Sequence, residues 1–263
     1  MTVTSKDNQW VKEWRRLNDS AKYRRESGLF AIEGARLCGD ALRSGVSLHT
    51  VMYTSSALAV YSDVVEVLLA SADNALEISP ELSRYMGDTM NPQGVFCIAK
   101  MLDNSLIIDK INIIGKYSAL EDIQDPGNMG TIIRTAEALG LDGILLSDGC
   151  CDVYNPKVLR ASMGGVFRMP LMRVGDMAQT VTDLQERGLN AFACVVDATA
   201  TSITEVGMGN GSVALIGNEG NGLRAETVAV CKHRVTIPMA GRAESLNASM
   251  AAGIVLWEMC RGE

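Results

Sequence analysis

From about residue 112 onward, short apolar segments alternate with segments of helical periodicity, and this alternation restricts the chain to few folds. Strands are expected at 117–123, 143–147, 168–174, 190–196, 212–217 and 234–238, and helices at 128–139, 156–167, 176–187 and 245–260. Such an order predicts an α/β protein with a parallel or mostly parallel sheet covered by helices on both faces. Ligands of these sheets bind at the carboxyl ends of the strands, so the loops that enter helices are the places to look for a site.

A smaller α/β unit precedes this region and is expected to end near residue 100. Its expected elements are a strand and a helix within 28–45, a strand at 48–55, a helix at 57–72 and a strand at 94–100. Residues 101–111 are expected to connect the two parts. The run SLIIDKINII at 105–114 is too apolar for a free linker, which indicates that the connector packs against another part of the protein.

Residues 1–37 combine charged and aromatic side chains, with a local excess of three positive charges. The cations are Lys6, Lys12, Arg15, Arg16, Lys22, Arg24, Arg25 and Arg36, and the acids are Asp7, Glu13, Asp19, Glu26 and Glu33. Two interpretations stay open. The segment could be a solvated amphipathic helix, or it could face RNA, with cations holding phosphates and Trp10, Trp14 and Tyr23 stacking on bases.

Composition describes a protein rich in aliphatic residues and glycine, with enough core material for one large domain or two small ones. The net charge of −7 argues against non-specific adhesion to nucleic acid over the whole surface. Seven scattered cysteines without a C-x-x-C pair predict reduced thiols rather than a disulfide framework or a zinc site. Residues 1–30 contain no apolar signal region, and AAGIVLW at 251–257 is too short to span a bilayer. A cytoplasmic protein without a membrane segment is therefore expected.

Three loops carry the polar residues that could do chemistry. DPGNMGTIIRTAEALG at 125–140 is a turn followed by a helix, and it matches neither of the two common nucleotide-binding glycine loops. In ALIGNEGNGL at 214–223 a strand runs into closely spaced glycines, which allow tight turns and close approach of a ligand. In IPMAGRAESLNASMAAGIVLWEM at 237–259, Ser245 or Asn247 is expected to cap a helix. Each loop alone could be only a structural turn; three at successive strand ends of one sheet favour a site.

Taken together, these stretches resemble the three motifs of the SpoU (TrmH) class of SPOUT RNA methyltransferases, in order and in separation. YNPKVLRASMGGVFRMPL at 154–171 resembles the segment that the family places between its first and second motifs. LFAIEGARL at 29–37 and NPQGVFCIA at 91–99 resemble the substrate-binding domain attached to many members, which has a small fold like that of some ribosomal proteins. The resemblance thus covers nearly the whole chain.

The resemblance implies transfer of a methyl group from S-adenosylmethionine to a ribose 2′-hydroxyl of ribosomal or transfer RNA. It also implies a homodimer and a carboxy-terminal SPOUT domain, residues 112–263, with a deep trefoil knot. Residues 1–103 would be the small RNA substrate-binding domain. Because the simplest transfer-RNA members lack such a domain, ribosomal RNA is the favoured substrate and transfer RNA the alternative.

The matching motif positions imply the site residues. Active-site residues would be Asn128, Arg134, Glu219, Ser245 and Asn247, and cofactor-binding residues would be Gly217, Ile237 and Leu246 together with Leu215, Asn218, Gly220 and Met239. A guanidinium is almost never deprotonated, so Arg134 is expected to stabilise developing alkoxide charge and grip the adjacent phosphate rather than remove the proton. Asn128 could orient the RNA or cap its helix, and Glu219 could be catalytic or structural. Ser245 and Asn247 could bind the ligand, cap the last helix, or do both.

Other chemistries find less support in the sequence. His49 and His233 are the only histidines and lie in different halves, which disfavours a Ser-His-Asp arrangement and a His-based zinc site, so no metal is expected. A nicotinamide-dependent oxidoreductase would need the missing G-x-G-x-x-G loop. A non-catalytic RNA-binding or ribosome-assembly protein of the same fold stays open as an alternative. Lys157 and Arg160, three positions apart on one helical face, are expected to contact RNA or solvent.

Overall fold

The computed structural model describes residues 2–89, 91–102 and 110–261, and within it the chain divides into two compact units. The amino-terminal unit comprises residues 1–103 and 154–167, and the carboxy-terminal unit comprises residues 104–153 and 168–263. Residues 154–167 thus group with the amino-terminal unit, whereas the sequence assigned them to the methyltransferase domain. The aromatic rings of Tyr154 and Phe167 lie 4.5 and 6.0 Å from that of Phe30, which accounts for the grouping.

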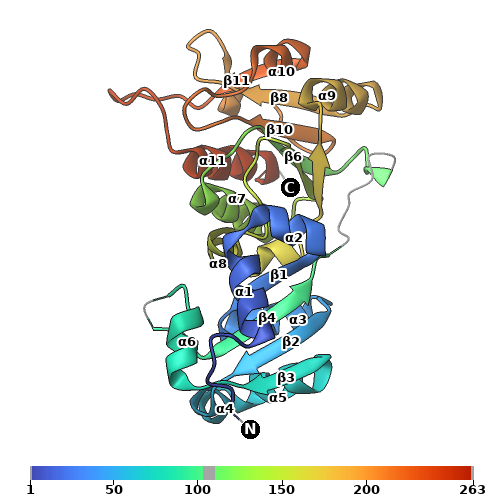
Figure 1. Cartoon of the computed structure of the whole chain (residues 1–263). Coiled ribbons are helices and arrows are strands. Elements are labelled where there is room, and N and C mark those ends of the chain that lie inside the picture. Colours follow the sequence, from blue (N-terminus) through green and yellow to red (C-terminus); the bar gives the residue numbers. More distant parts are fainter. Residues whose placement is uncertain (1, 90, 103–109, 262–263) are drawn as a thin grey trace. The chain divides into compact units, whose positions relative to one another are not determined.

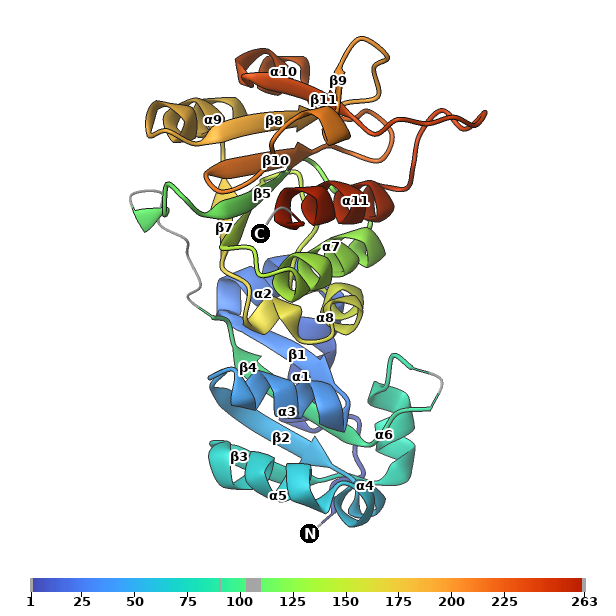
Figure 2. The same cartoon turned by 180° about the vertical axis from the view of Figure 1, so that it is seen from behind.

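The amino-terminal unit is built on a four-stranded sheet with the order β1-β4-β2-β3. Its strands are β1 (Leu29–Glu33), β2 (Leu48–Tyr53), β3 (Asn74–Glu77) and β4 (Val95–Lys100). Its helices are α1 (Gln9–Asp19), α2 (Ala21–Ser27), α3 (Ala35–Arg43), α4 (Ser55–Val60), α5 (Ser62–Ser71), α6 (Pro80–Met86) and α8 (Pro156–Ser162), with a 3₁₀ turn at Gly165–Phe167. Strand β4 runs antiparallel to β1 and β2, and β2 is parallel to β3. Helices α1 and α6 pack on one face of the sheet, and α3 and α5 lie on the other (Figures 1 and 2).

The aromatic side chains of the first two helices contact other side chains of the protein. Trp14 is fully buried in the core beside Phe96. The ring of Tyr23 is covered by the Arg16 guanidinium, 3.9 Å from its centroid, and its hydroxyl donates to the Glu13 carboxylate. Burial of Trp14 rules out its stacking on an RNA base. The segment contains two helices, α1 and α2, instead of one, and RNA contact by its exposed cations stays a prediction.

The carboxy-terminal unit confirms the expected parallel sheet. Its seven strands have the order β7-β6-β5-β10-β8-β11-β9, and all six neighbouring pairs are parallel. The strands are β5 (Lys116–Leu120), β6 (Gly143–Ser147), β7 (Leu171–Val174), β8 (Asn190–Cys194), β9 (Thr201–Ser202), β10 (Ser212–Ile216) and β11 (His233–Thr236).

Helices cover both faces of this sheet (Figures 1 and 2). They are α7 (Pro126–Ala138), α9 (Met177–Glu186), α10 (Ala225–Val230) and α11 (Ala248–Cys260), with a 3₁₀ turn at Ile203–Glu205. Val213 and Leu215 of β10 join a core cluster with α9, whereas α11 packs on β10 and alongside α7. Side chains alternate along a strand, so Ala214 and Ile216 face the α7/α11 side.

Several expected elements differ in extent from the observed ones. The helix at 57–72 is two helices, α4 and α5, which meet at Tyr61, and the helix at 156–167 ends at Ser162 because Met163 adopts a left-handed conformation (φ 49°). The helix at 245–260 begins only at Ala248, with Asn247 as its cap. Most of the expected connector, 103–109, lies outside the described residues. Its neighbour Ile111 is buried in the core of the carboxy-terminal unit.

Candidate functional site

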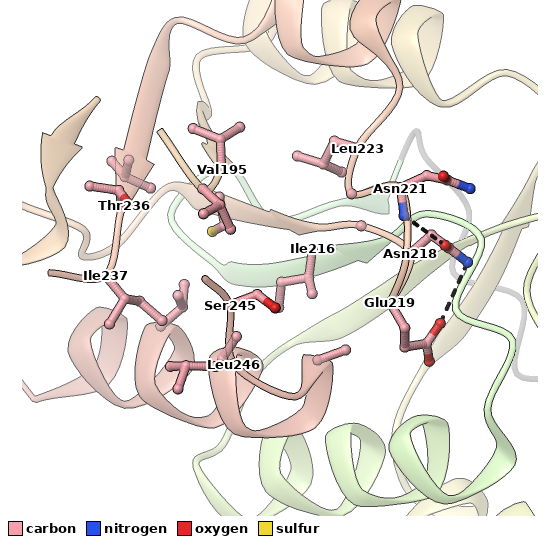
Figure 3. Close-up of a pocket in the computed structure, with 18 of the residues that line it drawn as sticks. Val195, Ile216, Asn218, Glu219, Asn221, Leu223, Thr236, Ile237, Ser245 and Leu246 are labelled. Carbon is pink, nitrogen blue, oxygen red and sulfur yellow. Dashed lines mark hydrogen bonds between the residues drawn. The ribbon is translucent and has the colours of Figure 1, made fainter. Parts of the chain in front are cut away.

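The polar loops meet at the carboxyl ends of the strands of the seven-stranded sheet, because the parallel strands β5, β10, β8 and β11 are consecutive neighbours. A pocket of about 530 Å³ opens there. It is lined by Cys194, Val195, Val196, Ile203, Ile216, Gly217, Asn218, Glu219, Gly220, Asn221, Gly222, Leu223, Val235, Thr236, Ile237, Met239, Glu244, Ser245, Leu246, Ala248, Ala251 and Val255. This volume falls within the range of small-molecule sites. Figure 3 shows Asn218, Glu219 and Asn221 at one end of the pocket and Thr236 and Ile237 at the other.

Six of the seven predicted cofactor residues line this pocket: Gly217, Asn218, Gly220, Ile237, Met239 and Leu246. Leu215 does not, because its side chain is fully buried in the core on the α9 side of the sheet. Its neighbour Ile216 points to the opposite face and lines the pocket instead. The pocket is therefore apolar along β10 and β11 and is bordered by the polar and glycine-rich loop that follows β10.

Gly217 is required by the tight fold of that loop. Asn218 and Gly222 exchange two backbone hydrogen bonds of 3.0 and 2.9 Å, which closes the loop into a narrow turn. A Cβ atom on Gly217 would lie less than 3.0 Å from the carbonyl carbon of Gly222 and the amide nitrogen of Leu223. Only glycine fits there, and at this position no side chain stands between the backbone and the pocket.

Three of the predicted active-site residues form a continuous hydrogen-bonded chain. The Asn247 side-chain amide donates to the Asn128 side-chain oxygen at 3.0 Å, and the Asn128 amide donates to Glu219 at 3.0 Å. Asn128 is buried in the first turn of α7, whose cap is Asp125, whereas Asn247 caps α11 through the N–H groups of Ser249 and Met250. These hydrogen bonds connect all three loops, which lie far apart in the sequence.

Glu219 is held as a carboxylate by this arrangement. Burial alone would raise its pKa, but the hydrogen bond from Asn128 and those from the backbone N–H groups of Asp125 and Gln124 outweigh it, so the pKa of Glu219 lies below its ordinary value. A carboxylate that is stabilised in this way is a weak base near neutral pH. The geometry therefore favours a structural and electrostatic role for Glu219 over proton abstraction.

The remaining predicted residues are placed differently. Arg134 lies exposed on α7, two turns from its start, and has no ion pair among the residues that the structure describes. Ser245 is exposed and lines the pocket, but it does not cap α11. Arg160, which the sequence assigned to RNA or solvent, forms an ion pair with Asp88 at 2.7 Å, and Lys157 is exposed.

Sequence reasoning missed several residues of the site. Cys194, Ile203, Thr236 and Glu244 also line the pocket, and burial raises the pKa of the Cys194 thiol to about 12. Glu121, directly after β5, is almost completely buried and accepts hydrogen bonds from the loop after β10. The adjacent acids in LEDIQDP, next to a buried strand, were the signal that could have indicated it.

The described ranges contain neither a metal-ligand cluster nor a membrane-spanning helix. No cluster of three or more His, Cys, Asp and Glu side chains there could hold a metal ion. None of the helices in residues 2–89, 91–102 and 110–261 is long and apolar enough to cross a membrane.

The fold and site together define an α/β protein with a small-molecule pocket at the strand ends of a parallel sheet, where Glu219 of the pocket lining is hydrogen-bonded to a buried asparagine. The model of the SpoU rRNA methylase family matches residues 117–257, and the model of the MRM3-like substrate-binding domain matches residues 8–97. The chain therefore belongs to the SpoU rRNA methylase family.

Individual relatives extend over nearly the whole chain. The 23S rRNA (guanosine(2553)-2′-O)-methyltransferase RlmP of Bacillus subtilis is 29% identical, over 98% of this chain and 98% of its own. The 23S rRNA (uridine(2479)-2′-O)-methyltransferase of Streptomyces viridochromogenes is also 29% identical, over 98% of this chain and 91% of its own. The structure of an AdoMet-bound rRNA methyltransferase from Sinorhizobium meliloti superposes with a TM-score of 0.84 at 32% identity, covering 98% of this chain and 96% of the other. This confirms the expected methyltransferase fold.

Proposed function

We propose that the protein transfers a methyl group from S-adenosylmethionine to a ribose 2′-hydroxyl of RNA, with ribosomal RNA as the favoured substrate. The observation that carries the proposal is the row of hydrogen bonds from Asn247 through Asn128 to Glu219, which joins three motif residues, one of them in the lining of the pocket. The named relatives modify ribose in 23S rRNA, one at a guanosine and the other at a uridine. The methylated nucleotide therefore differs within the family, and it must be found for this chain by experiment.

The pocket suits the methyl donor. Its volume of about 530 Å³, its apolar lining along Ile216 and Ile237, and the bare backbone at Gly217 match a ligand that has an adenine ring, an aliphatic chain with a sulfonium group and hydrogen-bonding edges. When bound, S-adenosylmethionine supplies an electrophilic methyl group on a positively charged sulfur. Gly217, Asn218 and Gly220 would hold it from one side, and Ile237, Met239 and Leu246 from the other.

The chain's own residues would act mainly by positioning and by electrostatics. A bond forms between the ribose 2′-oxygen and the methyl carbon while the carbon–sulfur bond breaks, and the hydroxyl proton passes to solvent. Arg134 is a free, exposed cation on α7 and would stabilise the developing negative charge on the oxygen and contact the adjacent phosphate. Asn128 would orient the ribose, because its own side chain is fixed from both sides. No metal ion is needed in this scheme, since the cationic sulfur would leave the methyl carbon as a neutral thioether.

A homodimer forms part of the proposal. Met250, Ile254 and Trp257 are spaced along one face of α11 and are 62%, 37% and 59% exposed. Exposed apolar residues in such a row are typical of a protein interface. A second copy of this chain would cover them, and Trp257→Glu is expected to convert a dimer into monomers in analytical ultracentrifugation; a wild-type monomer would contradict this part.

Two other features implied by the resemblance also belong to the proposal. The first is the deep trefoil knot in the carboxy-terminal unit, which tracing of the chain in an experimental structure would test. The second is a cytoplasmic location. The seven cysteines are in the thiol form in the structure, which supports a reducing compartment, and fractionation of the cell would test it.

The direct test is transfer of a labelled methyl group to unmodified ribosomal RNA and, separately, to transfer RNA, followed by alkaline hydrolysis. Label in alkali-stable dinucleotides is expected with ribosomal RNA, because a methylated ribose cannot assist cleavage of its own phosphodiester. Label in mononucleotides would mean base methylation and would overturn the proposed reaction. Label only with transfer RNA would keep the reaction and change the substrate.

A further inference from the structure

Two acidic residues directly after β5 hold residues 217–224, which we name the cofactor loop. The first, Glu121, is 1% exposed. Its backbone N–H donates to the carbonyl oxygen of Ile216 at 2.9 Å, where the cofactor loop begins. Its carboxylate accepts hydrogen bonds from the backbone N–H of Arg224 at 2.8 Å and from the Thr227 hydroxyl at 2.7 Å, where the loop ends. Glu121 therefore fixes both ends of the loop.

The second, Asp122, contacts the cofactor loop at two further points. One of its carboxylate oxygens accepts from Nε and Nη2 of Arg224, at 2.9 and 2.7 Å. Its backbone carbonyl oxygen accepts from the side-chain amide of Asn218 at 2.8 Å. Asn218 in turn accepts the N–H groups of Gly220 and Asn221, at 2.9 and 3.0 Å, which shapes the turn that lines the pocket.

Asp122 makes these contacts from a backbone conformation that side chains disfavour. Its φ is 57°, one of only two positive values among the described non-glycine residues. Ser147 holds it there, by accepting from the Asp122 N–H at 2.9 Å and donating to the carboxylate at 2.8 Å. A Cβ on Gly149 would lie less than 3.0 Å from the same carboxylate, so only glycine at position 149 leaves room for the Asp122 side chain. Glycine would suit this backbone better than aspartate, which indicates that the carboxylate itself is needed.

We propose that Asp122 and Arg224 are positioning residues that keep the cofactor loop closed over the bound methyl donor. This inference rests on the proposed function. Besides the contacts of Glu121 and Asp122, the segment 121–128 holds the loop through the Asn128–Glu219 hydrogen bond. Opening of the loop at Arg224 would therefore loosen the cofactor site first, and would leave the contacts of the amino-terminal unit unchanged.

The test compares Asp122→Gly, Arg224→Gln, Arg224→Lys and the Asp122→Gly/Arg224→Gln double variant with the wild type. Glycine at 122 removes the carboxylate and relieves the left-handed backbone, so folding should survive; the melting temperature checks this. The control is Arg168→Gln, which removes a different ion pair of the same unit, to Glu137, with the same distance of 2.7 Å. Titration calorimetry with S-adenosylmethionine gives the Kd, and steady-state methyl transfer gives kcat and both KM values.

Asp122→Gly and Arg224→Gln are each expected to raise the Kd and KM for S-adenosylmethionine by about threefold to tenfold, since the pair is partly exposed. The KM for RNA and the melting temperature should stay near wild type, and Arg168→Gln should match wild type throughout. The double variant should be no worse than either single variant, because both remove the same contact, and Arg224→Lys should recover part of the affinity.

The outcomes separate this inference from the proposed function. Unchanged cofactor affinity in Asp122→Gly and Arg224→Gln, with an active wild type, would overturn the positioning role alone. Additive losses in the double variant, or losses that follow the melting temperature, would overturn it as well. A wild-type chain that binds no S-adenosylmethionine would overturn the proposed function and the positioning role with it.

Discussion

Replacement of Gly217 by alanine is expected to destroy the cofactor site, and the structure allows the size of the effect to be worked out. The added Cβ would lie less than 3.0 Å from backbone atoms of both Gly222 and Leu223, and backbone atoms cannot turn aside as the end of a flexible side chain can. The loop would have to open. Opening breaks the two hydrogen bonds between Asn218 and Gly222 that close it.

The free energy has two parts. Overpacking of a tight contact costs about 1–3 kcal/mol, and each lost hydrogen bond costs about 0.5–1.5 kcal/mol. The sum is about 2–6 kcal/mol. Because every 1.4 kcal/mol corresponds to a factor of ten, S-adenosylmethionine should bind at least about 30-fold more weakly to Gly217→Ala if the loop opens locally. If the loop cannot open locally, the same free energy appears as a lower melting temperature.

Titration calorimetry together with thermal unfolding, each with and without S-adenosylmethionine, distinguishes these cases. The matched control is Gly209→Ala in the same unit, where an added Cβ would meet no atom within 4 Å and the backbone φ is not positive. This control should bind the cofactor as the wild type does. A Gly217→Ala variant with a cofactor Kd within twofold of wild type and an unchanged melting temperature would refute the reasoning.

Four other expectations follow from the described contacts. Asn128→Ala removes the two hydrogen bonds that connect Glu219 with Asn247, so methyl transfer should fall by about tenfold to hundredfold; kcat near wild type would contradict the role of these hydrogen bonds. The pKa of Glu219 is depressed below its ordinary value of 4.5, so its stabilising effect is present above that pH and is lost as the pH falls through the folded pKa. The melting-temperature difference between wild type and Glu219→Gln should therefore stay constant from neutral pH down to 4.5 and shrink as the pH falls below 4.5. For Arg134→Lys, a pH–rate profile that merely shifts, with little loss of rate, would count against the electrostatic role of Arg134. Arg24 is 2% exposed and donates to the carbonyl oxygens at the end of α1, so Arg24→Met should lower the melting temperature without changing the Kd for S-adenosylmethionine.

The main features of the fold could be predicted from the sequence because they follow from periodicity. The apolar strands predicted at 143–147 and 212–217 consist almost entirely of buried residues, and both are interior strands of the parallel sheet. Helix limits were less predictable, because they depend on single backbone conformations. The left-handed conformation of Met163 ends α8 at Ser162, five residues before the end of the predicted helix at 167. Methionine has no preference for this conformation, so the sequence could not predict it.

The candidate site was predictable where its residues stand in contiguous motifs. Gly217, Asn218 and Ile237 were found in this way and line the pocket. The side chain of Leu215 does not line the pocket, whereas that of Ile216 does. In a strand, adjacent side chains point to opposite faces, so the family's loop pattern alone could not decide between Leu215 and Ile216.

Contacts between distant segments could not be predicted from local pattern at all. Glu121 and Arg224 are 103 positions apart, and their hydrogen bond exists only because β5 and β10 are neighbours in the sheet. Pairing of β5 with β10 brings the end of one strand beside the loop that leaves the other. An acid placed directly after β5 therefore meets the backbone N–H of Arg224, and no local pattern around Glu121 indicates that partner. The same pairing explains why Asn128 and Glu219 meet, although the sequence left open whether each was catalytic or structural. Strand order, rather than the chemistry of any single motif, thus decides which polar residues share the site.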